Sequence, residues 1–134
     1  MIGWGQIAYG AVLSAIAAGL LLTLSSGRLR STGPGPRSWL ERLPVILAGG
    51  ISAASAPLAW NAILRATEAR SFFVDAPLVV LPASWQDTGS GIYTLALAAL
   101  VLGAGPLAAE PGRRVAVSAL LCGLAAFLVD VYLY

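Results

Sequence analysis

Four long apolar segments dominate the chain, and within them the residues do not alternate between apolar and polar as membrane β-strands do. The segments cover residues 2–25, 43–64, 91–109 and 115–134. About 20 apolar residues let an α-helix cross the hydrocarbon core of a bilayer. Because lipid offers the backbone no hydrogen-bond partners, each segment is predicted to be a membrane-spanning α-helix. The first segment is too long for a signal peptide and has no cation ahead of it, so we expect it to be permanent.

The composition agrees with this pattern. Of the 134 residues, 58% are hydrophobic and 10% are charged, and the mean hydropathy is +0.83. Soluble domains carry about 25% charged residues, so the composition excludes a soluble globular protein. We therefore expect one all-α integral membrane domain over residues 1–134, a small four-helix bundle with linkers at 26–42, 65–90 and 110–114.

The arginine and aromatic residues indicate how the helices are oriented. The first and third linkers together hold six arginines, and the second holds two, Arg65 and Arg70. Because cationic loops stay in the cytoplasm, we expect a multi-pass protein of the cell membrane (inner or plasma) with both termini outside. Trp and Tyr favour membrane interfaces, and Trp39 is expected at the inner one. The others are expected at the outer interface: Trp4, Tyr9, Trp60, Trp85, Tyr93, Tyr132 and Tyr134.

One carboxylate, that of Asp130, interrupts the apolar segments. Asn61 and Arg65 at the end of the second segment, and Gln6 near the start of the first, are expected at the same level. One interpretation is an outward-facing ion or substrate site in which Asp130 pairs with Arg65. The other is that Asp130 simply reaches the lipid headgroups, where a charge costs little. Its position near the end of the fourth segment favours the second interpretation.

The linker 65–90 is unusually apolar for a connection. Its run from Pro77 to Pro82 is too short to cross a bilayer, and large apolar side chains exposed to water form an adhesive surface. These residues are expected to lie in the membrane interface, to cover the helix ends, or to contact another protein: Phe72, Phe73, Leu78, Leu81 and Trp85. A docking surface for a partner and a simple cap on the bundle both remain open.

Polar residues between Ser84 and Gly91 precede the third predicted helix. Asp87 or Ser90 is expected to cap this helix. The free N–H groups of such a helix end also suit an anion, for example a lipid headgroup phosphate. Capping alone is the commoner role of these residues and is favoured.

Small residues indicate where the helices approach each other closely. Gly49 and Ala53 lie four residues apart in a stretch of the second segment where small residues cover every face. Pro57 is expected to kink this helix, with Ser52 or Ser55 bonding to the backbone groups that the proline leaves without a partner.

The chain offers few residues for catalysis or metal binding. It has no histidine and one cysteine, Cys122, which excludes histidine-ligated haem, a histidine general base and a Cys/His zinc site from this chain alone. Cys122 is expected to be a buried packing residue, because no nearby cation would activate its thiol. We expect no catalytic residue, no cofactor and no metal site, and the net charge of +2 is too small to suggest nucleic-acid binding.

Two functional hypotheses follow. The favoured one is an accessory, stabilising or assembly subunit of a larger membrane complex, because the chain has no catalytic constellation and carries an apolar linker. The alternative is a small oligomeric transporter or channel that uses Asp130, Asn61 and Arg65. The first segment holds no carboxylate, which excludes a four-helix multidrug antiporter.

Overall fold

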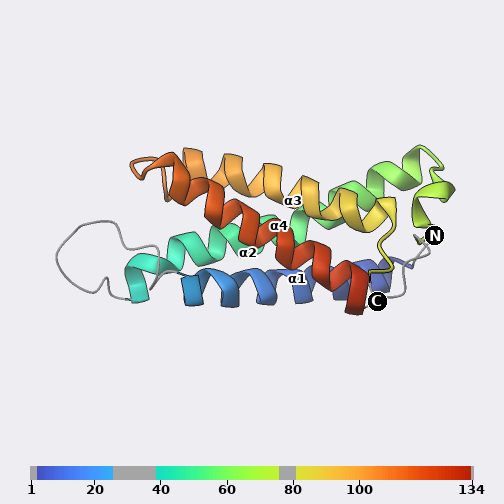
Figure 1. Cartoon of the computed structure of the whole chain (residues 1–134), viewed down its shortest axis with the longest axis horizontal. Helices are drawn as coiled ribbons and strands as arrows, with labels where there is room; N and C mark the ends of the chain where they lie inside the picture. The colour runs from blue at the N-terminus through green and yellow to red at the C-terminus, as the bar shows by residue number, and fades with distance from the viewer. Residues whose placement is uncertain (1–2, 26–38, 76–80, 134) are drawn as a thin grey trace.

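The computed structural model describes residues 3–25, 39–75 and 81–133. Within these ranges the chain forms four α-helices, α1 (Trp4–Ser25), α2 (Trp39–Ala66), α3 (Trp85–Ala104) and α4 (Gly112–Leu133), and a short 3₁₀ helix, η1 (Arg70–Phe73). The α-helices run alternately in opposite directions and form one bundle (Figure 1). Each is long and apolar enough to cross a membrane, which confirms the predicted all-helical architecture.

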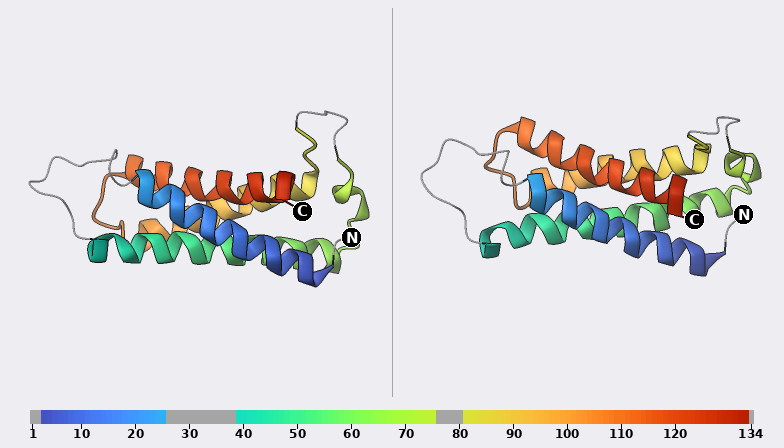
Figure 2. Two further views of the ribbon diagram at one scale, coloured as in Figure 1. Left: turned by 90° about the horizontal axis from the view of Figure 1, so that it is seen from below. Right: turned by 60° about the horizontal axis from the view of Figure 1, so that its bottom comes forward.

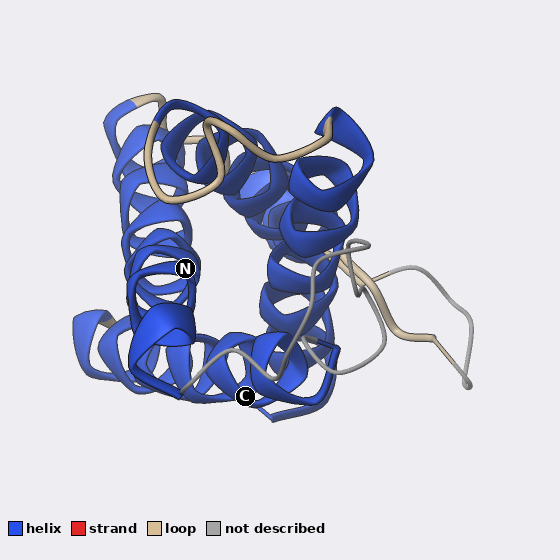
Figure 3. Cartoon of the chain, turned by 90° about the vertical axis from the view of Figure 1, so that its left-hand side faces the viewer, coloured by secondary structure: helices blue, strands red, loops and turns tan. Residues whose placement is uncertain are grey.

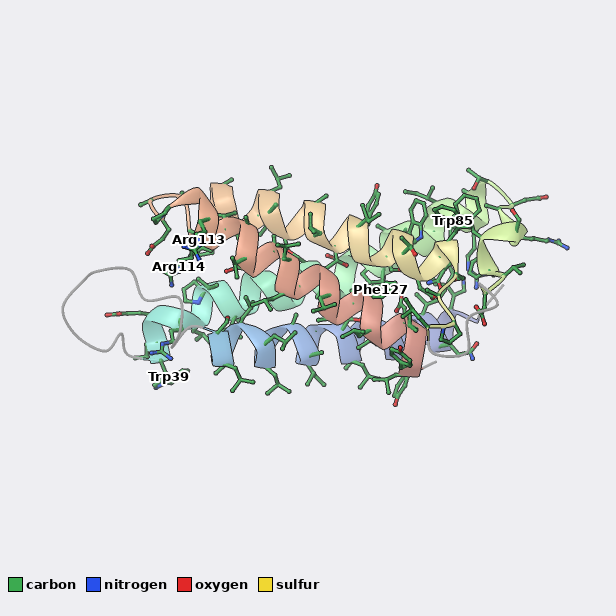
Figure 4. The ribbon with its side chains drawn as sticks, in the orientation of Figure 1. Trp39, Trp85, Arg113, Arg114 and Phe127 are labelled. Atoms are coloured by element: carbon green, nitrogen blue, oxygen red, sulfur yellow. The ribbon has the colours of Figure 1, made fainter. Side chains whose placement is uncertain are left out.

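The bundle has two chemically different ends. At the end we call the terminal end, α1 begins, α2 ends, α3 begins and α4 ends (Figure 1). The helix η1 lies at this end, beyond the last turn of α2 (Figure 2). Trp85 also lies there, whereas Trp39, Arg113 and Arg114 lie at the opposite end, which we call the arginine end (Figure 4). The sequence predicts the same division, with Trp85 at one end of the helices and Trp39, Arg113 and Arg114 at the other.

Each helix packs against the next one in the chain, and α1 closes the ring against α4 (Figure 3). Helices α2 and α4 also meet across the middle of the bundle, where Gly49 lies against Cys122. A Cβ added at Gly49 would lie 3.1 Å from Cys122 Sγ and would overlap Leu22. The predicted close approach at Gly49 and the predicted burial of Cys122 are therefore confirmed.

The outer surface of the bundle is apolar along its middle. Large aliphatic side chains of the described helices are exposed there, among them Val12, Ile16, Leu20, Ile51, Leu100 and Leu120. Such a surface is unfavourable in water and typical of helices surrounded by lipid tails. The helices are thus apolar on their outer faces as well as on most of their inner ones.

Helix α3 begins at Trp85, earlier than the predicted residue 91, because a capping box starts it. The Oγ of Ser84 accepts a hydrogen bond from Asp87 N over 3.2 Å, and Asp87 Oδ2 accepts one from Ser84 N over 2.7 Å. Each residue thereby satisfies a backbone N–H that the helix leaves without a partner. The N-cap is therefore Ser84, and not Asp87 or Ser90, although Asp87 contributes to the cap as the third residue of the helix.

The other helix boundaries also differ from the prediction. Helix α3 ends at Ala104 and not at 109, since Pro106 has no N–H to continue the ladder. Helix α4 begins at Gly112, and an ion pair between Arg114 Nη1 and Glu110 Oε1 at 2.6 Å joins its first turn to the preceding connection. Helix α2 begins at Trp39 and not at residue 43. This agrees with the alternative that the sequence also allows, in which Ser38 and Glu41 fit a capping box and start the helix there.

Helix α2 ends in a Schellman motif at Glu68, whose φ of 52° is left-handed. The N–H of Ala69 donates to Leu64 O over 3.0 Å, and the N–H of Glu68 donates to Arg65 O over 3.2 Å. The turn directs the chain into η1. It therefore sets where the linker leaves the bundle.

Pro57 lies inside α2 and removes the N–H that would bond to the carbonyl of Ala53. The hydroxyls of Ser52 and Ser55 donate to Ala48 O and Ile51 O, over 2.8 Å and 2.7 Å. Neither serine therefore compensates for the proline, and that prediction is wrong. A serine in a helix bonds to the carbonyl three or four residues earlier. The carbonyl of Ala53 would therefore need a hydroxyl at position 56 or 57, which are Ala and Pro.

Candidate functional site

The interior of the bundle differs in polarity between its two halves. Toward the arginine end it is filled by an apolar cluster made of Ala18, Leu22, Ala53, Ala98, Leu102, Leu107, Ala119, Cys122 and Ala125. Ser52 and Ser118 are buried among these residues. From the middle to the terminal end, the described residues include a buried set that we call the polar cluster: Ser14, Asn61, Gln86, Ser90, Thr94 and Asp130. Each α-helix contributes at least one of them, and burying such groups is unfavourable unless they are hydrogen-bonded.

Asp130 is turned into the bundle, with 3% of its surface exposed. Its Oδ2 accepts a hydrogen bond from Gln86 Nε2 over 3.3 Å, and the same nitrogen lies 3.4 Å from Ser90 Oγ. Asp130 therefore faces the interior of the bundle, and its position at the level of the lipid headgroups stays a prediction. It lies four and eight positions after the buried Ala126 and Cys122, so all three share the inner face of α4.

Asn61 is fully buried on the inner face of α2. Its Nδ2 donates to Pro57 O over 3.0 Å, which fixes the amide and leaves Oδ1 without a hydrogen-bond donor among the described residues. The neighbouring Trp60 donates its indole N–H to Gln86 O over 3.1 Å. Asn61 therefore lies level with the first turn of α3, where Gln86 meets Asp130.

Arg65 and Gln6, the other two residues of the predicted cluster, lie differently. The guanidinium carbon of Arg65 is 4.7 Å from the ring centroid of Trp4, which joins the end of α2 to the start of α1 through a cation–π contact. Gln6 is exposed, and its Oε1 accepts a hydrogen bond from Gly3 N over 3.1 Å. Arg65 thus lies at the margin of the polar cluster, and Gln6 caps its own helix outside it.

Sequence reasoning missed Gln86, Ser90, Thr94 and Ser14. Gln86 and Ser90 were assigned to the linker because α3 was expected to begin at residue 91. The capping pair Ser84 and Asp87, three residues apart, is the signal that would have placed them in the helix.

The linker residues expected to form a docking surface or cap divide into two groups. Phe72 packs with its ring centroid 6.3 Å from that of Trp60, which in turn lies 5.8 Å from Tyr93. Phe73 is half-buried. Trp85 and Leu81 are exposed, Trp85 to 68% of its surface. Leu78 lies outside the described residues.

The start of α3 does not suit the lipid phosphate that its free N–H groups could otherwise attract. The capping box brings the carboxylate of Asp87 to this helix end. Ser84 Oγ, which already accepts from Asp87 N, also lies 2.8 Å from Asp87 Oδ2. A negative charge thus stands where an anion would have to bind.

The polar cluster can bind a molecule through its hydrogen-bonding groups and one carboxylate. Over the ranges that the structure describes, no three His, Cys, Asp or Glu side chains lie together in a way that could hold a metal ion. No known protein family matches the chain, and no curated protein or solved structure matches it.

Proposed function

We propose that the chain is a small membrane transporter that binds a polar solute at the polar cluster. The proposal is supported by the burial of Asp130 beside Gln86, inside a bundle whose helices are long enough to cross a membrane. An ionisable side chain within a membrane-spanning bundle is energetically costly and marks places where ions, protons or substrates are handled. Packing alone would be served as well by apolar side chains, as in the arginine half.

The groups in the cluster define what it would bind. They comprise one carboxylate, two amides and three hydroxyls. This set binds a small uncharged or positively charged solute through hydrogen bonds and leaves it chemically unchanged. Beyond it, the apolar cluster closes the arginine half of the interior. Passage of the solute across the membrane therefore requires the helices to rearrange or a second copy of the chain to take part.

We also propose that the terminal end, with both chain termini, faces the outside of the cell. The proposal is supported by Arg113 and Arg114, which lie at the opposite end, the same end as Trp39 (Figure 4). Cationic residues are retained on the cytoplasmic side. The solute would then enter the polar cluster from the outside.

The test is solute-dependent stability together with uptake. The purified protein would be heated with Na⁺, K⁺, ethylamine, glycine or glycerol, and uptake of each labelled probe into proteoliposomes would be measured. We expect at least one probe to raise the Tm of the wild type and to accumulate. Asp130→Asn should abolish both effects, whereas Gln6→Leu, which alters an exposed residue, should retain them. Equal behaviour of wild type and Asp130→Asn with every probe would contradict the proposal.

A second candidate function is an accessory subunit of a larger membrane complex. It is favoured by apolar residues exposed at the terminal end, which are Val74 and Leu81 in the linker and Trp85 at the first position of α3. Purification in a mild detergent would then recover a larger membrane protein in fixed stoichiometry. Trp85→Ala combined with Leu81→Ala should release it, whereas Trp39→Ala, which alters an equally exposed tryptophan at the arginine end, should not.

A further inference from the structure

Three polar atoms of the polar cluster are fully buried, in addition to the contact between Gln86 and Asp130. They are Ser14 Oγ of α1, Asn61 Oδ1 of α2 and Thr94 Oγ1 of α3. None has a hydrogen-bond partner in the described part of the chain. A buried donor or acceptor without a partner is destabilising, so each of these atoms needs one from another source.

Other hydroxyls in these helices obtain a partner from their own helix. Thr23, Ser52 and Ser55 donate to the carbonyl one turn earlier, over 2.7 Å, 2.8 Å and 2.7 Å. This local bond is available to any Ser or Thr in a helix. Ser14 and Thr94 do not make it, although both are completely shielded by the other helices.

We propose that bound water enters the bundle from the terminal end as far as Ser14 and Thr94 and stops at the apolar cluster. Water donates and accepts, so it can satisfy a hydroxyl and an amide oxygen together. Several buried residues of the same helices are small, among them Gly10 and Ala11 of α1 and Ala126 of α4, so the side chains there add little volume. The inference does not depend on transport, because these atoms need a partner whether or not a solute is bound.

The boundary of the hydrated region lies within one helical turn. Ala18 follows Ser14 by four residues on α1, and Ala98 follows Thr94 by four residues on α3. Both alanines are fully buried and belong to the apolar cluster. On the proposal, the same inner face of each of these two helices changes from hydrated to dry over one turn.

Solid-state NMR of the isotope-labelled full chain in lipid bilayers tests this directly. Polarisation transferred from water should reach Ser14 and Thr94 several-fold faster than Ala18 and Ala98. Equally slow transfer at all four residues would show a dry interior and would overturn the proposal. Equally fast transfer at all four would show that water does not stop at the apolar cluster and would also overturn it.

A variant provides a second measurement. Thr94→Val keeps the shape of the side chain and removes its hydroxyl. If water bridges Thr94 and its neighbours, this variant should slow the transfer to Ser14 or Asn61 and lower the Tm. Thr23→Val, at an exposed hydroxyl that bonds to its own helix, should leave the transfer to the interior unchanged. A higher Tm for Thr94→Val with unchanged transfer would mean that the hydroxyl is simply desolvated, which would contradict bound water.

Discussion

Gln86 and Asp130 are joined side chain to side chain over 3.3 Å inside the bundle, although 44 positions separate them in the chain. The amide of Gln86 thereby connects the first turn of α3 to the last turn of α4. It also brings Ser90 into the same group, at 3.4 Å. This contact organises the terminal end of the interior.

Gln86→Leu should destabilise the protein by about 1–3 kcal/mol, because it removes a hydrogen-bond donor from the buried carboxylate of Asp130. The free energy of unfolding would be measured by denaturant titration in detergent micelles. Gln6→Leu provides the control, since it removes an exposed amide whose bond to Gly3 N only caps its own helix, and it should cost less than about 1 kcal/mol. If the two variants lowered the free energy of unfolding equally, the contact between Gln86 and Asp130 would add no stability of its own.

Gly89→Ala should loosen α3 from α2. A Cβ at Gly89 would overlap the Trp60 ring, which is held in place by its hydrogen bond to Gln86 O. Forcing extra volume into such a site costs about 1–3 kcal/mol. Loss of stability and a shift in tryptophan fluorescence would be measured. Gly5→Ala is the matched control, because its added Cβ has no atom within 4 Å, and this variant should be neutral or slightly more stable. A Gly89→Ala protein with wild-type stability and fluorescence would contradict the close packing.

The contact between Arg65 and Trp4 should give a measurable coupling energy. A double-mutant cycle with Arg65→Met and Trp4→Leu is expected to yield about 0.5–2 kcal/mol for a guanidinium over an indole ring. The cycle separates this pair from any other interaction of Arg65. The control cycle pairs Trp4→Leu with Arg70→Met, at an exposed residue, and should be additive. Additivity in both cycles would rule out a stabilising contact.

Reporter fusions should establish the proposed orientation. Alkaline phosphatase fused after the last residue should be active, and a fluorescent protein at the same position should be dark, because the C-terminus is expected outside. A fusion in the connection between α3 and α4, beside Arg113, should give the reverse result. If both positions gave the opposite pattern, the protein would face the other way.

The number and approximate position of the helices could be predicted from the sequence, because crossing a bilayer requires a length of apolar chain that any window of about 20 residues reveals. The opposite placement of Trp85 and the arginine pair could be predicted for a similar reason, since composition varies along the chain from one end of each helix to the other. The span of each helix and the end at which a residue lies both depend only on the residue's position along the chain.

The start of α3 could not be predicted as well, and this error concealed two of the six residues of the polar cluster. Gln86 and Ser90 are polar, so an apolar window ends before them. The local bonds between Ser84 and Asp87 nevertheless extend the helix past both residues. Hydrogen bonding at the helix end, and not hydropathy, determines the boundary here.

Which side of each helix faces inward was decided only by the tertiary structure. In a soluble protein the apolar stripe of a helix indicates its buried face, whereas these helices are apolar outside as well as inside. The sequence therefore revealed the level of Asp130 and Asn61 but not their direction. Packing turned both into the bundle and Gln6 out of it, because close approach at residues such as Gly49 selects the faces that meet, and a side chain on those faces is buried whatever its polarity.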